Sequence, residues 1–207
     1  MFIVLEGIEG SGKTTQARLL AEWLRGRGVP VVATREPGGT EVGERIRTLL
    51  LEGPAPGDRA ELFLLLAARA ELIRQVVEPA LREGAVVLAD RFSLSTLAYQ
   101  VHGRGLPEGE VRRTDALARG GLWPDVTVLL DLPAEVSEAR RSQRTADRIE
   151  AAGEAFHARV AEAYRLLAGT EAGIVVVDAR GEPETVHRAV RGVLAERFPE
   201  TFANETG

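Results

Sequence analysis

Phe2-Ile3-Val4-Leu5-Glu6 is a short apolar run near the start of the chain, and Gly7-Ile8-Glu9-Gly10-Ser11-Gly12-Lys13-Thr14 follows at once. The second stretch fits G-x-x-x-x-G-K-[ST], and helical periodicity continues from Lys13 to residue 25. A strand, this motif and a helix in that order predict a loop that binds phosphate. Glycines allow backbone torsions that let consecutive N–H groups point at an anion, and the helix N-terminus adds its positive dipole end. The alternative is a glycine-rich turn that matches the motif by chance.

Two side chains of the motif bring specific chemistry to such a loop. Lys13 can reach the β- and γ-phosphates of a nucleotide, and the Thr14 hydroxyl can ligate Mg²⁺. Lys13 is the only lysine among the 26 Lys and Arg residues, and a compact ammonium fits a tight phosphate site better than a planar guanidinium. We therefore expect the nucleotide to contact Gly7, Glu9, Gly10, Ser11, Gly12, Lys13, Thr14 and Thr15.

The length and composition restrict the class of protein. A chain of 207 residues is long enough for a substantial core, and we expect one domain over residues 1–207. A net charge of -5 argues against binding duplex nucleic acid, because no basic surplus is available to neutralise its phosphates. The absence of cysteine excludes disulfides and thiolate metal sites, and the three scattered histidines suggest no metal cluster. The N-terminal apolar run is too short for a signal peptide or a membrane span, so we expect a cytoplasmic protein with no membrane partner.

Apolar runs and helical periodicity alternate along the chain. We expect strands at Phe2–Glu6, 29–34, Val86–Asp90, Val126–Asp131 and Ile174–Asp178, the last three being near-continuous apolar runs typical of a parallel sheet covered on both faces. We expect helices at 13–25, Glu41–Leu51, 58–83, 93–101, Glu108–Arg119, Ala134–Arg141, 154–168 and Pro183–Arg197. The run at 62–68 is apolar all round, which predicts burial on most sides, and the last nine residues look frayed. The predicted fold class is therefore α/β, with a five-stranded parallel sheet and helices on both faces.

In such a sheet, ligands bind beyond the carboxyl ends of the strands. The second strand leads into Arg35-Glu36-Pro37, the third ends in Asp90-Arg91, and an arginine-rich stretch at 140–148 follows the fourth. Asp90 stands where a carboxylate would hold Mg²⁺ through water, and Arg91 is placed to bind a second phosphate. The alternative for Asp90-Arg91 is a helix cap with a surface ion pair. Two basic loops over one phosphate loop favour phosphoryl transfer between two anionic substrates over hydrolysis of a single nucleotide.

Longer motifs carry a family resemblance that runs from Phe2 to about Asp178. They are TREPGGT at 34–40, AAR at 67–69, DR at 90–91 followed by STLAYQ at 95–100, and DRIE at 147–150. With these motifs the chain resembles the bacterial thymidylate kinases, which have the P-loop kinase fold with a short lid. The resemblance implies that ATP phosphorylates thymidine 5′-monophosphate (dTMP) to the diphosphate, by in-line transfer with Mg²⁺. It also implies a homodimer formed through helices.

The resemblance assigns roles to residues around the acceptor. Arg69 would hydrogen-bond thymine, Gln100 would also meet the base, and Tyr99 would lie under the sugar and disfavour a 2′-hydroxyl. Arg35 and Arg91 would hold or bridge the acceptor phosphate. The full set expected around the acceptor is Glu9, Arg35, Glu36, Pro37, Leu65, Arg69, Arg91, Ser95, Thr96, Tyr99 and Gln100.

One position departs from the family pattern. The family usually has a phenylalanine four residues before the arginine that matches Arg69, where it stacks on thymine, and this chain has Leu65 there. Aromatic stacking on the base, worth about 1–3 kcal/mol, is therefore lost. Phe63 lies on the wrong side of a helix to replace it. For Tyr99, helical spacing alone is equally typical of an ordinary amphipathic surface residue.

The lid is the predicted source of positive charge for the transition state. The variable positions of the phosphate loop, residues 8–11, carry no basic side chain, so an arginine must reach the phosphoryl group from another segment. By the resemblance, the lid at about 140–150 supplies it, with Arg144 as the catalytic match and Arg140 packing on adenine. Catalysis would then depend on Lys13, Arg91 and Arg144. The alternative is that the lid arginines are only a solvated helix end.

Other functions compete with this interpretation. Another deoxynucleotide or deoxynucleoside kinase would differ only in its base pocket. A non-catalytic nucleotide sensor would keep the phosphate loop but would not need the arginines that follow strands three and four. A P-loop GTPase is disfavoured, because the chain has no Asn-Lys-x-Asp motif. The apolar run at 62–68 permits dimerisation, although an apolar helix face is more often simply core.

Overall fold

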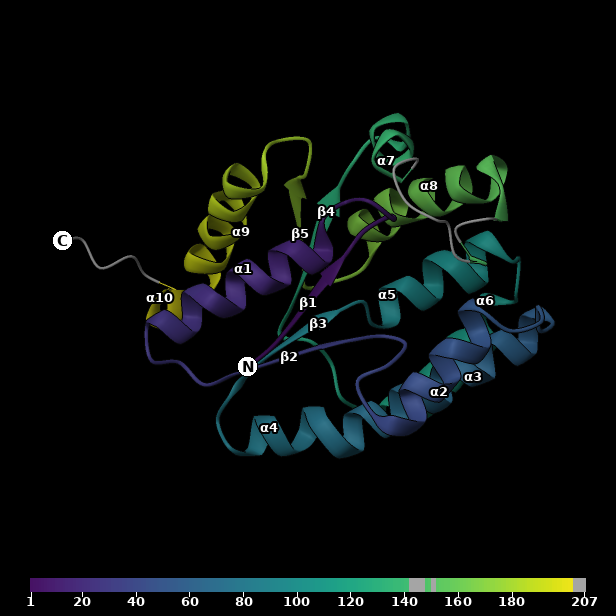
Figure 1. Ribbon diagram of the computed structural model, residues 1–207, viewed down its shortest axis with the longest axis horizontal. Coiled ribbons are helices and arrows are strands. Elements are labelled where there is room, and N and C mark those ends of the chain that lie inside the picture. Colours follow the sequence, from purple (N-terminus) through teal and green to yellow (C-terminus); the bar gives the residue numbers. More distant parts are fainter. Residues whose placement is uncertain (142–147, 150–151, 203–207) are drawn as a thin grey trace.

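A sheet of five parallel strands forms the centre of the computed structural model, which describes residues 1–141, 148–149 and 152–202 (Figure 1). The strands are β1 (Phe2–Glu6), β2 (Val31–Arg35), β3 (Val86–Asp90), β4 (Val126–Asp131) and β5 (Ile174–Asp178), in the order β2-β3-β1-β4-β5. Arg35 pairs in register with Asp90, and Asp131 with Asp178, so the carboxyl ends of the strands meet at one edge of the sheet. The predicted five-stranded parallel sheet is confirmed.

Helices cover both faces of this sheet. They are α1 (Lys13–Gly26), α2 (Glu41–Leu51), α3 (Asp58–Leu72), α4 (Glu78–Arg82), α5 (Ser93–Thr96), α6 (Glu108–Arg119), α7 (Ala134–Arg141), α8 (Glu154–Thr170), α9 (Pro183–Arg197) and α10 (Pro199–Phe202), with two π-helical segments, η1 (Ile73–Val77) and η2 (Leu97–Gly103). α1 and α9 pack on one face, and α4 and α8 pack on the other (Figure 1). In the described part of the chain, no helix combines the length and the apolar character needed to cross a membrane.

Alternate residues of β1 pack on opposite faces of the sheet. Ile3 and Leu5 join a core cluster that includes two leucines of α1, whereas Phe2 and Val4 join a second cluster built with η1 and α4. Each of these four side chains is at most 1% exposed. Because successive strand residues point to opposite faces and both faces are covered, the strand appears in the sequence as a continuous apolar run.

Among the differences from the predicted elements, two have clear local features. β2 begins two residues late, because the Val29 N–H donates to the Leu24 carbonyl (3.1 Å) at the end of α1, and Pro30 has no N–H to donate. The single helix predicted at 58–83 is a continuous helical path that contains η1 between α3 and α4. Such π-helical turns are often found near functional sites. The helix predicted at 93–101 likewise consists of α5 followed by η2, which extends it to Gly103.

Two expectations about burial are wrong. The run at 62–68 is not buried on most sides, because Phe63 is 59% exposed while Leu62 and Leu66 are buried. The last nine residues are not all frayed, because residues 199–202 form α10. Phe202 is fully buried and stacks on Trp23 of α1, with ring centroids 5.8 Å apart. An aromatic anchor therefore ties α10 to the first helix.

Candidate functional site

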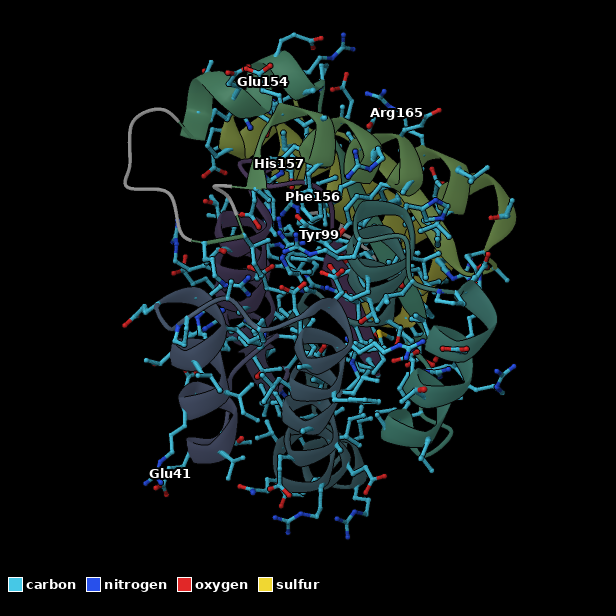
Figure 2. All side chains as sticks on the ribbon, turned by 90° about the vertical axis from the view of Figure 1, so that its right-hand side faces the viewer. Glu41, Tyr99, Glu154, Phe156, His157 and Arg165 are labelled. Carbon is cyan, nitrogen blue, oxygen red and sulfur yellow. The ribbon has the colours of Figure 1, made fainter. Side chains whose placement is uncertain are left out.

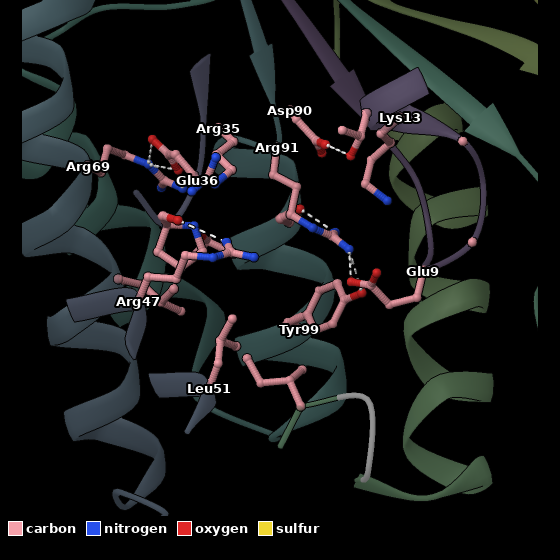
Figure 3. Close-up of a pocket in the computed structure, with 18 of the residues that line it drawn as sticks. Glu9, Lys13, Arg35, Glu36, Arg47, Leu51, Arg69, Asp90, Arg91 and Tyr99 are labelled. Atoms are coloured by element: carbon pink, nitrogen blue, oxygen red, sulfur yellow. Dashed lines mark hydrogen bonds and ion pairs between the residues drawn. The ribbon is translucent and has the colours of Figure 1, made fainter. Parts of the chain in front are cut away.

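A cavity of about 440 Å³ opens beyond the carboxyl ends of β1, β2 and β3 (Figure 3). The predicted residues that line it are Glu9, Gly10, Gly12, Lys13, Thr14, Thr15, Arg35, Glu36, Pro37, Leu65, Arg69, Asp90, Arg91, Ser95, Thr96, Tyr99, Gln100 and Arg140. Gly7 and Ser11 belong to the phosphate loop without lining the cavity. Arg144 lies outside the described residues. The structure thus brings almost the whole predicted set into one place.

The charge of this cavity suits polyanionic substrates. Its lining includes one lysine and five arginines against three carboxylates. In Figure 3, Lys13 and Asp90 lie at one end, Arg69 and Glu36 at the other, and Arg91 between them. The cations are therefore spread along the cavity, as two separate anionic groups would require.

The phosphate loop has the backbone shape that its glycines predict. Gly7 has φ of 142°, and a Cβ there would come within 2.6 Å of the Leu130 carbonyl oxygen, so a side chain is excluded. Gly12 precedes α1 with φ of 93°, in the left-handed region. Helix α7 supports the loop from outside. Ser137 Oγ donates to the Glu9 carbonyl (2.6 Å), and Arg140 Nη1 donates to the Gly10 carbonyl (3.1 Å).

Lys13 is buried at the start of α1, and its ammonium donates to the carbonyl of Ile8 (2.9 Å). Burial lowers the pKa of Lys13 and the nearby Arg91 lowers it further, whereas the carboxylates of Glu9 and Asp90 oppose the shift. Two buried cations close together disfavour each other's charge, and a bound phosphate would relieve that repulsion. The electrostatics of the loop therefore favour an anion in the cavity.

The two predicted metal ligands lie in direct contact. Thr14 Oγ1 donates to Asp90 Oδ2 at 2.6 Å, although the two residues are 76 positions apart in sequence. A hydroxyl and a carboxylate are hard oxygen donors, the type that Mg²⁺ prefers. The described residues contain no cluster of three or more His, Cys, Asp or Glu side chains able to hold a metal. An ion at Thr14 and Asp90 would therefore take its remaining ligands from phosphate and water.

Arg91 lies at the centre of the cavity and has an unusual backbone. Its φ of 75° is in the left-handed region, which costs a non-glycine residue about 1–3 kcal/mol and persists only where the surroundings hold it. Its guanidinium forms an ion pair with Glu9 and donates to Tyr99 and Ser95 (3.2 and 3.1 Å). Burial alone would lower the pKa of Arg91, but Glu9 and the neighbouring tyrosines raise it, so the side chain stays charged.

Arg69 occupies the other end of the cavity and is held by two carboxylates. Its Nε and Nη2 donate to Glu36 Oε2 (2.9 and 2.5 Å), and its Nη1 donates to Asp115 of α6. The three side chains are at most 7% exposed, and the guanidinium stacks on Phe92 at 4.8 Å. Because a guanidinium has five N–H groups, one on each terminal nitrogen remains for a ligand.

Tyr99 is an interior residue, so the alternative of an ordinary surface position is excluded. It is 7% exposed, its ring lies 5.1 Å beneath the Arg91 guanidinium, and it makes an edge contact with Phe156 (6.0 Å). Figure 2 shows Tyr99 and Phe156 inside the molecule, in contrast to Glu41 and Arg165 at its periphery. Burial raises the pKa of the Tyr99 hydroxyl, which therefore remains protonated.

Several site residues were missed by the sequence analysis. Arg47, Leu51 and Ile149 also line the cavity, and Arg47 Nη1 donates to the Pro37 carbonyl (3.0 Å). The i,i+4 spacing of Arg47 and Leu51 places them on one face of α2, but the sequence does not reveal which face meets the site. Glu6, which is fully buried, accepts from the Ser95 and Phe92 N–H groups (3.0 and 2.8 Å) and fixes the start of α5.

Comparison with known proteins identifies the family. The thymidylate kinase family model matches residues 5–190. The thymidylate kinase of Synechococcus sp. (strain WH7803) is 51% identical over 201 residues, covering 93% of this chain and 94% of that protein. The thymidylate kinase of Thermomicrobium roseum is 48% identical over 198 residues, covering 94% of each. Among solved structures, thymidylate kinase from Ehrlichia chaffeensis aligns with a TM-score of 0.79 at 33% identity, over 94% of this chain and 98% of that chain. The chain therefore belongs to the thymidylate kinase family.

Proposed function

We propose that this chain transfers the terminal phosphoryl group of ATP to dTMP, giving ADP and the diphosphate. One observation carries the proposal beyond family membership. Lys13 of the phosphate loop lies at one end of the cavity, and Arg69, which is buried and held by carboxylates, lies at the opposite end (Figure 3). A nucleotide sensor needs only the first of these features, whereas a kinase with a nucleotide acceptor needs both.

The donor side would be formed by the phosphate loop. Its N–H groups and Lys13 would bind the β- and γ-phosphates of ATP, and Arg140 would lie near adenine. Arg140 links Gly10 to the Ala179 carbonyl (3.2 Å), which follows β5, and so borders the donor end of the cavity. Mg²⁺ fits Thr14 and Asp90, because magnesium in nucleotide sites takes one or two carboxylates together with substrate phosphates. When bound, the ion would neutralise charge on the transferred phosphoryl group.

The acceptor side would be formed by the loops after β2 and β3. Arg35 and Arg91 would hold the dTMP phosphate, and the base would lie between Arg69 and Gln100. Arg35 Nη2 donates to Glu44 Oε2 (2.9 Å), and this bond orients the guanidinium. The Gly39 N–H donates to Glu44 Oε1 (2.8 Å) and holds the carboxylate in place. This hydrogen bond from Gly39 is the main reason that the pKa of Glu44 is lowered, so the carboxylate stays charged beside Arg35. The remaining acceptor contacts would come from Glu9, Glu36, Pro37, Leu65, Ser95, Thr96 and Tyr99.

The catalytic set would be Lys13, Arg91 and Arg144, with the lid at about 140–150 closing over a single domain. A cluster of cations around the transferred group stabilises the charge that spreads over its equatorial oxygens. Lys13 and Arg91 line the cavity, which supports their part in this set.

A homodimer is also part of the proposal. Large apolar side chains remain exposed on α2, α3 and α6, which pack side by side: Leu49 is 44%, Phe63 59% and Leu117 82% exposed. Burial of such side chains against a second copy is favourable. Sedimentation would check it, because Phe63→Asp should convert a wild-type dimer to monomer, and a wild-type monomer would exclude the dimer.

The reaction is tested by coupling ADP release to a panel of acceptors. With ATP as donor, dTMP should give the highest kcat/KM among dTMP, dCMP, dAMP, dGMP and thymidine. A preference for thymidine would indicate a deoxynucleoside kinase, and a preference for another monophosphate would indicate a different base. Binding of ATP and dTMP in calorimetry without any ADP release would identify a sensor and overturn the proposal.

A further inference from the structure

A carboxylate outside the predicted site connects three segments around the base end of the cavity. Glu61 lies in α3 and is 2% exposed. Its Oε1 accepts from Gln100 Nε2 and Arg104 Nε (3.1 Å each), and its Oε2 accepts from Arg104 Nη2 and Arg148 Nη2 (3.1 and 2.9 Å). Both oxygens are therefore occupied, by donors from Gln100 in η2, from Arg104 just after η2, and from Arg148.

This arrangement decides which end of the Gln100 amide faces the cavity. An ionised carboxylate can only accept hydrogen bonds, so it must meet the NH₂ group of Gln100 and not its carbonyl oxygen. Burial alone would raise the pKa of Glu61, but hydrogen bonds from Arg104, Arg148 and Gln100 lower it, so the carboxylate is charged. Gln100 itself is 2% exposed and lines the cavity, and the described contacts of its side chain use only the nitrogen. Its carbonyl oxygen is therefore the acceptor left for a ligand.

The two ends of a side-chain amide distinguish pyrimidines, because the oxygen accepts hydrogen bonds and the NH₂ group donates them. Thymine and uracil carry a donor at N3 and an acceptor at O4, whereas cytosine has an acceptor at N3 and a donor at N4. Arg69, a donor only, is complementary to O4. A Gln100 side chain that presents its carbonyl oxygen is complementary to the N3–H of thymine and opposes the lone pair of cytosine.

We propose that Glu61 is a positioning residue for base specificity, which acts by holding the Gln100 amide with its carbonyl oxygen toward the base. The inference rests on the proposed function, because it requires a pyrimidine nucleotide in the cavity. Glu61 also binds Arg148, so the same carboxylate joins the base end of the cavity to a described residue near the end of the lid segment.

The substitution Glu61→Gln tests the proposal, because it should reverse the orientation of the Gln100 amide. A glutamine has one oxygen, and the site of Oε2 is faced by two arginine donors, so that oxygen should stay there. Its NH₂ would take the place of Oε1, which is faced by only one arginine donor, Arg104 Nε, and by Gln100. The Gln100 amide would then turn its carbonyl oxygen toward this NH₂ and away from the cavity. We expect the ratio of kcat/KM for dTMP to that for dCMP to fall at least about tenfold. The ratio for dTMP to dUMP should not change, because both bases carry N3–H.

Matched variants separate this role from a general loss of structure. Gln100→Ala should lower the dTMP to dCMP ratio similarly, and adding Glu61→Gln to it should cause no further fall. Glu61→Asp, which keeps an acceptor-only group, should retain the ratio even where absolute rates drop. Glu71→Gln, which removes the charge of a half-buried carboxylate on the same helix, α3, that pairs with Arg74, should leave all ratios at wild type.

Three outcomes would overturn the proposal. One is an equal fall for all three substrates in Glu61→Gln. A second is an unchanged dTMP to dCMP ratio in Gln100→Ala, which decides the question even where Glu61→Gln does not fold. The third is a wild-type enzyme with no preference for dTMP over dCMP. Only this last result would also contradict the proposed function.

Discussion

At the scale of single residues, Lys13 carries the strongest prediction. It is the only lysine in the chain, it is buried, and its pKa is lowered by burial and by Arg91. We expect Lys13→Ala to reduce kcat by far more than tenfold, because the phosphate-neutralising charge is lost. The fold should stay intact, because the substitution removes a charge that burial disfavours.

ADP release and a thermal melt on the same preparation would check this. Arg18→Ala, an exposed residue of α1 that is paired with Glu22, is the matched control and should behave as wild type. A folded Lys13→Ala enzyme that keeps more than about a tenth of the rate would show that the loop does not work as proposed.

Leu65 carries a smaller prediction. It lines the cavity two residues after the exposed Phe63, which confirms that Phe63 is on the wrong side of the helix to stack on a base there. Leu65→Phe should tighten dTMP binding modestly, because a base stacked on an aromatic ring gains about 1–3 kcal/mol at most, less the leucine contact. Calorimetric titration with dTMP would measure it, with Phe63→Leu as the control. Weaker binding in Leu65→Phe would place the base elsewhere in the cavity.

The residues that line the cavity were easier to predict than the partners that orient them. The motifs placed Arg69 and Gln100 in the site, and both line the cavity. The carboxylates that orient them, Asp115 and Glu61, are 46 and 39 positions away and have no local signal in sequence. Long-range ion pairs depend on how helices pack, which periodicity within one helix does not reveal.

At the scale of elements, agreement was closest where one physical signal dominated. Val86–Asp90 and Val126–Asp131 have the predicted bounds, because a strand buried on both faces is a bounded apolar run. Ile174–Asp178 also has the predicted bounds, but it is an edge strand whose Val176 is 52% exposed, so its apolar run does not reflect burial on both faces. The π-helical segments η1 and η2 were not predictable. In these segments each backbone hydrogen bond spans one residue more than in an α-helix. The periodicity of side chains over a few turns does not reveal so small a change.

Helix α7 and the lid that follows it carry a paired prediction. Arg144→Ala should lower kcat at least about a hundredfold with little change in KM for dTMP, because an arginine that acts on the transition state leaves ground-state binding alone. Arg140→Ala should instead raise KM for ATP, because Arg140 contacts the loop at Gly10. Steady-state kinetics on both variants would decide between the roles. A near-normal kcat in Arg144→Ala would instead support the alternative that the lid arginines are only a solvated helix end.

At the scale of the whole molecule, the strand order explains why distant motifs meet. β1 lies between β3 and β4, so the phosphate loop after β1 is next to Asp90 and Arg91 after β3 and to α7 after β4. The sequence predicts that strand ends share an edge, but the order of strands across the sheet comes from packing. Because of that order, Thr14 Oγ1 lies 2.6 Å from Asp90 Oδ2.

The acid stability of the whole molecule should depend on Glu61, which joins α3 and η2 and, through Arg148, the Leu50 carbonyl of α2 (2.6 Å). Its pKa is lower in the folded protein than the ordinary 4.5, so its stabilisation is fully present above about pH 4.5 and is lost as the pH falls through the folded value. Glu61→Gln should therefore lower the free energy of unfolding by on the order of 2 kcal/mol at neutral pH. That difference should shrink on acidification, as measured by urea unfolding across the range. A gap between wild type and variant that stays constant below about pH 4.5 would mean that folding does not lower the pKa of Glu61.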